Sequence, residues 1–328
     1  MSAVADSVPV LTRHTACVVC DTDDPEPYQR GMYALRGRSF DLVRCRACRF
    51  VYVDPRPDGA TLAEMYDDAD YYTEGYNLGV ETENYFERRE ELLDRYDGEV
   101  SGLERELGGP AALLELGSAG GFFIEAARRR GWAVRGVELS PVAARFSIDE
   151  LGLEVFEGQL EEAPFEEESF DLCVADNVLE HTTTPLDVLG DLRSLMRPGG
   201  HLLVIVPTYV NSPYFRAARD LGRWLPRRLL GAKLLRLLKL DPEHDGGAPY
   251  HILEFDRATL LRLLQRVGLE VVSAQGSVPR PAHLFKAARL SPVDWLQRWT
   301  FVALDRLMRL GLLPGARLRV VVRRPRSS

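Results

Sequence analysis

Four cysteines of this 328-residue chain stand in two pairs that could bind one metal ion. Each pair has the spacing Cys-x-x-Cys, with Cys17 and Cys20 in the first and Cys45 and Cys48 in the second. Such a turn lets two thiolates reach one ion, and two turns supply the four sulfur ligands of a closed tetrahedral zinc site. The pattern therefore predicts a structural zinc ion that takes no part in catalysis. The alternative is four cysteines that bind nothing.

A second stretch whose residues could bind a ligand is ELGSAGG, which spans residues 115–121. Small residues let a backbone pass close under a ligand and leave amides free at the start of a helix. Dinucleotide enzymes use such turns too, so the turn alone does not select a cofactor. The next apolar run ends in Glu138, 21 residues after Gly117. A carboxylate at that place can accept hydrogen bonds from both hydroxyls of a ribose.

The elements that must position these residues alternate along the chain from residue 111 onward. Short apolar runs followed by helical stretches predict a parallel sheet with helices on both faces, and ligands bind beyond the carboxyl ends of its strands. Ser140 before Pro141 marks the start of one helix. The predicted strands are 111–117, 132–139, 153–158, 169–177 and 199–207, the helices are 121–131, 140–152, 185–196 and 256–267, and 268–276 with 316–324 form a terminal antiparallel pair.

Residues 111–207 resemble a class I S-adenosylmethionine-dependent methyltransferase. The motifs that carry the resemblance are ELGSAGG, VRGVELS, EGQLEEAPF, FDLCVADNVLEH and RPGGHLLVIVP, in the family's order. Two positions depart from the family pattern, with Ala119 where a glycine is usual and Gln159 where an aspartate is frequent. The leader CRACRFVYVDPRPDGATLAEMYDDADYY resembles the zinc knuckle found ahead of one subgroup, several members of which act on sugars or other small molecules.

The resemblance implies an α/β fold, a Rossmann-like doubly wound seven-stranded sheet with an N-terminal zinc ribbon and a helical lid insertion. The expected domains are a zinc ribbon over 1–58, a helical cap over 59–108 and a catalytic domain over 109–328. Within the last, the lid is expected at 208–250 and a helical insertion at 279–315.

The resemblance also implies a role for each residue of the cofactor site. Glu115 would steer the methionine end of S-adenosylmethionine, Glu138 would hold the ribose, and Asp176 and Asn177 would lie near the methyl donor. The other implied contacts are Gly117, Ser118, Ala119, Gly121 and Phe122 at the turn, Leu139 on the adenine, and Gln159 with Leu160 at the adenine edge. For the turn, a tight strand–helix connection without ligand is the alternative.

Two histidines are candidates for the base that takes a proton from the acceptor. His181 follows the fourth predicted strand, and His251 precedes a late helix. Histidine titrates in the range that such a transfer needs. A structural role is the alternative for each. Some related methyltransferases bind a divalent metal in the loop of His181, but Asn177 stands where one of the acids would be, so we expect no catalytic metal.

Two basic, amphipathic segments flank the late part of the catalytic domain. Residues 211–240 carry six Arg and two Lys against one Asp, and Trp295 and Trp299 lie one turn apart in the stretch 292–311. Core or dimer packing and peripheral contact with a membrane or a lipid-linked substrate are both compatible with this pattern. Tyr71, Tyr72 and Tyr250 are candidate acceptor-pocket aromatics, with ordinary packing as the alternative.

Composition and charge limit the location and the class of substrate that we expect. The chain is 45% hydrophobic with a formal net charge of −8, and it has neither a signal-peptide pattern nor an apolar run long enough for a membrane span. We therefore expect a cytoplasmic enzyme that methylates oxygen or carbon of a small molecule, such as a sugar nucleotide, a glycolipid or a secondary-metabolite intermediate. RNA methylation is the runner-up, although acidic residues 21–26 argue against a nucleic-acid surface. A non-catalytic cofactor-binding module is the other alternative.

Overall fold

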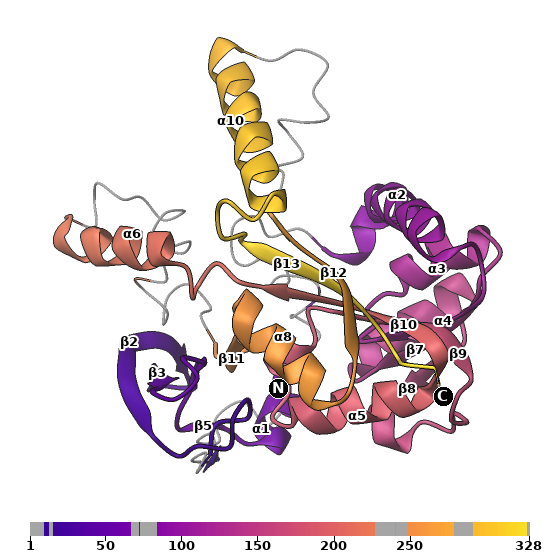
Figure 1. Ribbon diagram of the computed structural model, residues 1–328, viewed down its shortest axis with the longest axis horizontal. Coiled ribbons are helices and arrows are strands. Elements are labelled where there is room, and N and C mark those ends of the chain that lie inside the picture. Colours follow the sequence, from indigo (N-terminus) through magenta and orange to yellow (C-terminus); the bar gives the residue numbers. More distant parts are fainter. Residues whose placement is uncertain are drawn as a thin grey trace.

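A seven-stranded sheet with helices on both faces forms the centre of the computed structural model, which describes residues 10–12, 16–66, 72, 84–226, 240, 248–278 and 291–326 (Figure 1). The strand order is β12–β13–β10–β9–β6–β7–β8. Only β13 runs against its neighbours β10 and β12 among these strands. The bounds are β6 (Ala112–Leu116), β7 (Ala133–Glu138), β8 (Val155–Glu157), β9 (Phe170–Asp176), β10 (Met196–Pro207), β12 (Glu270–Ser277) and β13 (Arg317–Arg323).

The helices between these strands begin and end where the sequence predicts. In α4 (Pro141–Leu151) the Ser140 side chain accepts from the Ala143 amide, and Gly152 ends the helix in the left-handed conformation. The predicted parallel strands, their helices and the terminal antiparallel pair are thereby confirmed. The other described helices of this layer are α2 (Arg89–Leu107), α3 (Phe122–Arg129), α5 (Pro185–Leu195) and α8 (Arg257–Arg266).

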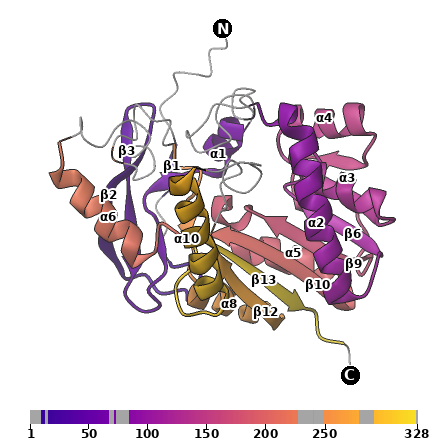
Figure 2. The ribbon, with the colours of Figure 1, turned by 90° about the horizontal axis from the view of Figure 1, so that it is seen from above.

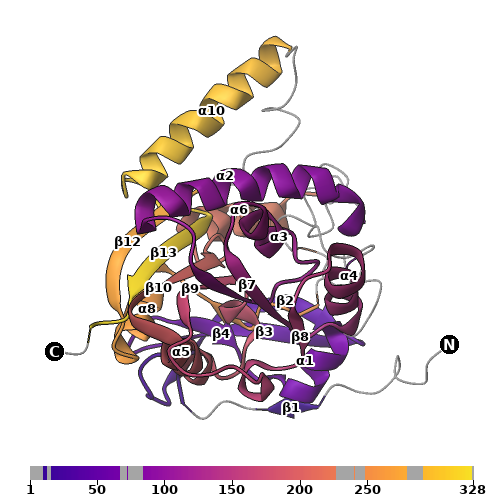
Figure 3. The ribbon, with the colours of Figure 1, turned by 90° about the vertical axis from the view of Figure 1, so that its right-hand side faces the viewer.

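Alternate residues of each strand face two separate cores. Leu113, Leu172 and Leu203 pack with residues of α2, α3 and α4, whereas Leu114, Cys173 and Leu202 pack with residues of α5 and α8. Figure 3 shows α2 and α3 on one side of the sheet and α5 on the other. Cys173 is a fully buried core residue, as its apolar surroundings in the sequence predict.

The cysteine-bearing leader forms a second sheet, of order β11–β4–β3–β2. One edge strand of this sheet, β11 (Leu253–Glu254), comes from the late part of the chain and pairs with β4 (Val51–Val53). The strands β2 (Pro25–Leu35) and β3 (Arg38–Cys45) precede them. Buried leader residues such as Phe50 belong to the same hydrophobic cluster as the α5–α8 face of the large sheet. The leader and the catalytic sheet therefore share one hydrophobic core, which extends across the domain boundary predicted at residue 58.

Smaller elements complete the described chain. They are the pair β1 (Leu11–Thr12) and β5 (Arg56–Pro57), α1 (Gly59–Tyr66), and the short 3-10 turns η2 (Phe86–Arg88), η3 (Leu160–Glu162) and η4 (Leu179–His181). Among the described residues, no helix has both the length and the apolarity that crossing a bilayer requires.

Two helices extend from the body, α6 (Pro213–Trp224) and α10 (Pro292–Arg309) (Figures 1 and 2). Helix α6 lies within the segment where the lid is expected, 208–250, and α10 lies within the insertion expected at 279–315. Residues 227–239 and 241–247 of the first segment and 279–290 of the second lie outside the described residues. Trp295 and Trp299 of α10 are 57% and 52% exposed, so they do not belong to this chain's own core.

Candidate active site

A small cavity of about 70 Å³ lies at the carboxyl ends of the adjacent strands β6 and β9. This is the sheet edge where parallel α/β proteins bind ligands. Among the residues assigned to the cofactor from the sequence, the structure brings six together around this cavity. They are Glu115, Gly117, Ser118, Ala119, Asp176 and Asn177, and the rest of the lining is Tyr85, Arg95, Tyr96 and Phe123.

Three buried polar atoms of this cavity have no hydrogen-bond partner: Oε2 of Glu115, Oγ of Ser118 and Oδ1 of Asp176. Burial raises the pKa of the Glu115 carboxyl well above its ordinary value, and the nearby carboxylates of Asp176 and Glu138 raise it further. A buried polar atom without a partner costs free energy unless a ligand satisfies it. The three oxygens can accept hydrogen bonds from an ammonium group, which is the donor at the methionine end of S-adenosylmethionine. The residues present therefore fit that cofactor.

The glycine turn after β6 has a backbone conformation that is unfavourable for residues with a side chain. Gly117 and Gly121 have φ angles of 70° and 74°. A Cβ on Gly117 would lie 2.6 Å from Cγ2 of Val178, and one on Gly121 would lie 2.6 Å from Cδ1 of Leu153. These contacts are too short for real carbon atoms, so glycine is required by sterics at both places. Ala119 adopts a φ of 47° in the same turn.

Glu138 fixes the turn from the end of β7. One carboxylate oxygen accepts from the amide of Ala119 at 2.7 Å, and the other accepts from the amide of Ser140 at 2.8 Å. The hydroxyl of Tyr72 lies 3.4 Å from the second oxygen. Burial raises the pKa of Glu138. The carboxylate is thus a buried anchor of the cofactor loop, and Tyr72 lies on this side of the site. Tyr71 is outside the described residues.

Arg317 joins the site from β13, although no motif in the sequence assigns it a role. Its guanidinium donates to Oδ2 of Asp176 at 2.6 Å. Glu99 of α2 is close enough for its charge to act on Arg317 and Asp176, and burial raises the pKa of Glu99. Arg95, from the same helix, lines the cavity and lies over the ring of Tyr96. In the sequence, the basic residues of 278–328 are compatible with a solvated face and with an acidic face of the same protein, so the fold is needed to identify Arg317.

The remaining residues assigned to the cofactor lie around the cavity rather than in its lining. Phe122 is fully buried, with ring centroids 5.3 Å from Tyr85 and 5.8 Å from Phe146. Gln159 is exposed and starts η3, where its amide donates to Oε2 of Glu162 at 3.3 Å. Leu139 is 41% exposed beyond β7, and Leu160 is buried.

His181 and His251 lie against each other, with ring centroids 4.9 Å apart. Nδ1 of His181 is 2.8 Å from the carbonyl oxygen of Tyr250, so this nitrogen carries the hydrogen and Nε2 carries the lone pair. Burial lowers the pKa of His181 to about 4. Neither histidine lines the described cofactor cavity. The segments that carry the two histidines are joined by the amide of Ile252, which donates to the carbonyl of Glu180 at 2.9 Å.

Glu180 lies beside the two histidines and is fully buried. Its Oε1 is 3.7 Å from Nε2 of His181, and burial raises the pKa of its carboxyl well above the ordinary value. Potential ligand atoms of Glu180, His181 and His251 all lie within 4.8 Å of one another. The expectation of no catalytic metal was based on Asn177 alone and stays a prediction.

The four leader cysteines converge as their spacing predicts. Sγ atoms of Cys17 and Cys48 are 3.5 Å apart, those of Cys20 and Cys45 are 3.6 Å apart, and all four lie within 4.8 Å of one another. Tetrahedral zinc with sulfur at about 2.3 Å needs sulfur atoms about 3.8 Å apart. Burial raises the pKa of Cys17 and brings that of Cys48 to about 11, so thiolates here need a cation beside them. The cluster is compatible with zinc.

Comparison with known proteins places the fold in a family. A family model described as a methyltransferase domain matches residues 85–274. The chain belongs to this methyltransferase family. An enzyme named ubiquinone biosynthesis O-methyltransferase from Ruegeria pomeroyi is 32% identical over 202 residues, which cover 58% of this chain and 72% of that protein. The protein of the same name from Alkalilimnicola ehrlichii is 33% identical over 153 residues, and the match covers 44% of this chain and 57% of that protein.

Among solved structures, the methyltransferase is similar to a SAM-dependent methyltransferase from Archaeoglobus fulgidus. The identity is 16%, the TM-score is 0.47, and the match covers 73% of this chain and 99% of that one. The predicted class, an S-adenosylmethionine-dependent methyltransferase, is confirmed by the family match. The family model begins at Tyr85, so it does not include the cysteine cluster.

Proposed function

We propose that this methyltransferase transfers the methyl group of S-adenosylmethionine to a hydroxyl group of a small-molecule acceptor. The observation that carries the proposal is the set of three buried, unpartnered oxygens on Glu115, Ser118 and Asp176 around one cavity. When bound, the cofactor supplies an electrophilic methyl group on a sulfonium. The named O-methyltransferase relatives support an oxygen acceptor. A sugar nucleotide, a glycolipid or a secondary-metabolite intermediate is the acceptor class that we propose.

In this proposal, different side chains of the site bind different groups of the cofactor. Glu115, Ser118 and Asp176 accept hydrogen bonds from the ammonium of the methionine end, and Arg95 of the same cavity provides a positive charge for its carboxylate. Glu138 holds the turn through the amides of Ala119 and Ser140, and its remaining lone pairs face the ribose in this proposal. Arg317 donates to Oδ2 of Asp176 at 2.6 Å and so places a positive charge beside this side chain.

For the acceptor, we propose that the His181–His251 pair would take the proton of the acceptor hydroxyl, so that its oxygen could act as the nucleophile. His181 is neutral at physiological pH because its pKa is about 4, and its Nδ1 is committed to the carbonyl of Tyr250. Nε2 is then the ring nitrogen that carries the lone pair. A base with so low a pKa is weak, so the neighbouring His251 is the natural partner to share the proton.

We also propose one zinc ion bound by Cys17, Cys20, Cys45 and Cys48, with a structural role. The sulfur separations and the closed set of four ligands support this assignment.

Binding and turnover are tested separately. Calorimetry with S-adenosylhomocysteine tests the cofactor site, and Ser118→Ala with Asp176→Asn should each weaken binding about tenfold. A metabolite screen with methyl-labelled cofactor then tests transfer. Binding without transfer to any small-molecule fraction, together with methylation of RNA, would replace the small-molecule proposal. Absence of cofactor binding in folded protein would remove the proposal as a whole.

A further inference from the structure

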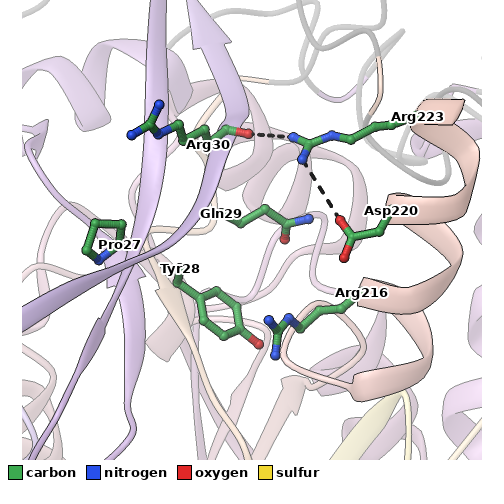
Figure 4. Close-up of a pocket in the computed structure, with 7 residues that line it drawn as sticks. All are labelled: Pro27, Tyr28, Gln29, Arg30, Arg216, Asp220 and Arg223. Carbon is green, nitrogen blue, oxygen red and sulfur yellow. Dashed lines mark hydrogen bonds and ion pairs between the residues drawn. The ribbon is translucent and has the colours of Figure 1, made fainter.

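A second and larger cavity lies away from the cofactor site, between the leader and α6. Its volume is about 270 Å³, and it shares no lining residue with the cavity around Glu115. Figure 4 shows the seven side chains of its wall, four from β2 and three from α6. They are Pro27, Tyr28, Gln29, Arg30, Arg216, Asp220 and Arg223. We call this space the β2–α6 pocket.

The backbone of β2 is irregular where it lines the pocket. Its register against β3 shifts between Pro27 and Gln29, and again between Gln29 and Tyr33. Such bulges re-aim side chains and take carbonyl groups out of the ladder. The carbonyl of Arg30 accepts from Arg223 at 2.9 Å, as Figure 4 shows, and the carbonyl of Gly31 accepts from the buried Arg219 at 2.9 Å. These two bonds fix one face of α6 over the strand.

Arg216 brings a positive charge to the pocket without a matching carboxylate. Its guanidinium lies 4.4 Å from the ring centroid of Tyr28, and in the part of the chain that the structure describes no acid forms an ion pair with it. Arg223 shares this face and lies 3.9 Å from Asp220, a loose contact at an exposed site. A guanidinium is a fixed fork of donors that matches phosphate oxygens. The Tyr28 hydroxyl donates to Asn211 at 3.1 Å, which holds the ring in place beneath Arg216.

Gln29 supplies an independent sign of a ligand. Its side chain is 93% removed from solvent, as its exposed fraction is 7%, and its Oε1 has no hydrogen-bond partner. In Figure 4 the amide lies between Tyr28 and Asp220 and points into the space in front of α6. A buried amide oxygen without a donor costs free energy that a hydroxyl of a ligand would recover. The pocket thus offers cationic donors on one wall and an orphaned acceptor on the other.

We propose that the β2–α6 pocket binds a phosphate group that is attached to a hydroxyl-bearing molecule, with Arg216 and Arg223 on the phosphate and Gln29 accepting from the hydroxyl. The site goes beyond methyl transfer, because its lining is separate from the cofactor cavity and its binding does not depend on catalysis. The phosphate has two sources, a free metabolite or a lipid headgroup, and both present the same chemistry to the pocket.

The experiment is calorimetric titration of the full-length protein with three probes: inorganic phosphate, glycerol 3-phosphate and glycerol. We expect glycerol 3-phosphate to bind best, phosphate to bind less well and glycerol not to bind. Arg216→Gln, which keeps most of the side-chain stem, should weaken glycerol 3-phosphate at least about tenfold. Gln29→Leu should reduce its affinity to that of inorganic phosphate. Arg262→Ala, which removes a positive charge from an exposed position of α8, is the matched control and should change nothing.

The outcomes separate this proposal from the proposed function. Each variant should bind S-adenosylhomocysteine as the wild type does, which also shows that it is folded. Co-flotation with vesicles of phosphatidylcholine and phosphatidic acid identifies the lipid source if the wild type floats and Arg216→Gln does not. Equal binding of glycerol 3-phosphate by wild type and Arg216→Gln, or no binding by the wild type, would overturn the proposal even if methyl transfer is established.

Discussion

The guanidinium of Arg317 donates to the carboxylate of Asp176 at 2.6 Å across a sequence separation of 141 residues. The two residues lie on β13 and at the end of β9, on either side of β10. This ion pair lies in a site that also contains the buried Glu115, whose pKa burial raises. The antiparallel strand that completes the sheet thus supplies the counter-charge of the cofactor site.

Removing this counter-charge should affect both stability and cofactor binding. Arg317→Ala leaves Asp176 partly buried beside other acids, so we expect a loss of about 2–4 kcal/mol in the free energy of unfolding. Cofactor affinity should fall at least about tenfold. Urea denaturation and calorimetry measure the two effects. The control is Arg323→Ala, on the same strand as Arg317, which breaks an exposed ion pair with Glu270 of β12. It should lower the free energy of unfolding by less than about 1 kcal/mol.

Glu138 should matter for the cofactor through the turn that it holds. Glu138→Ala removes the acceptors of the Ala119 and Ser140 amides, and we expect S-adenosylhomocysteine affinity to fall by about 1.5–3 kcal/mol. Glu157→Ala, at the exposed end of β8, is the matched control. Equal affinities of Glu138→Ala and wild type in calorimetry would remove the ribose and turn assignment.

The steric demand at Gly117 can be separated from its backbone strain. Gly117→Ala combines a positive φ with a Cβ 2.6 Å from Val178, so its cost should exceed that of Gly131→Ala. Gly131 also has a positive φ, of 92°, but no atom lies within 4 Å of its added Cβ. We expect about 1–2 kcal/mol for Gly131→Ala and more for Gly117→Ala. Val178→Ala should recover part of the difference, and if it recovers none, the contact is not the cause.

His181 should make stability depend on pH. Its folded pKa of about 4 lies below the ordinary value of 6.5, so the unfolded chain binds the proton first as the pH falls. The free energy of unfolding that His181 contributes is therefore fully present above about pH 6.5 and decreases toward pH 4, by about 3 kcal/mol. Glu115 and Glu180 act in the opposite direction, because their raised pKa values favour the protonated folded state at low pH.

The difference between wild type and His181→Asn isolates the histidine from these acids. Denaturation at pH values from 4 to 7 should show this difference growing in favour of the wild type as the pH rises. A difference that stays constant over this range would contradict the buried, neutral state of His181.

Metal removal should affect more than the leader. Elemental analysis should find about one zinc per chain, and Cys45→Ser should abolish most of it. Because β11 pairs with β4 and Arg266 of α8 donates to the carbonyl of Val19 at 2.8 Å, chelation should also loosen residues 250–266. Hydrogen exchange should then increase in both segments, and exchange confined to residues 16–57 would contradict the shared core.

Local rules in the sequence determined the elements of the fold. The helix start at Ser140, the glycine turn after β6 and the paired cysteine turns each depend on neighbours a few residues away, so their residue types suffice to predict them. The doubly wound seven-stranded sheet followed from the resemblance of the motifs to a methyltransferase family. The same motifs identified six residues that line the cofactor cavity.

Tertiary structure alone decided the long-range partners. Arg317 meets Asp176, α6 is fixed over β2, and His251 lies against His181 because distant strands and helices pack together. An exposed arginine and a buried counter-ion look alike in a sequence, since both are basic residues on an amphipathic element. Burial also decided that Phe122 joins the core and that Glu115 keeps an oxygen without a partner. These properties depend on which surfaces meet, and that is set by the packing of the whole chain.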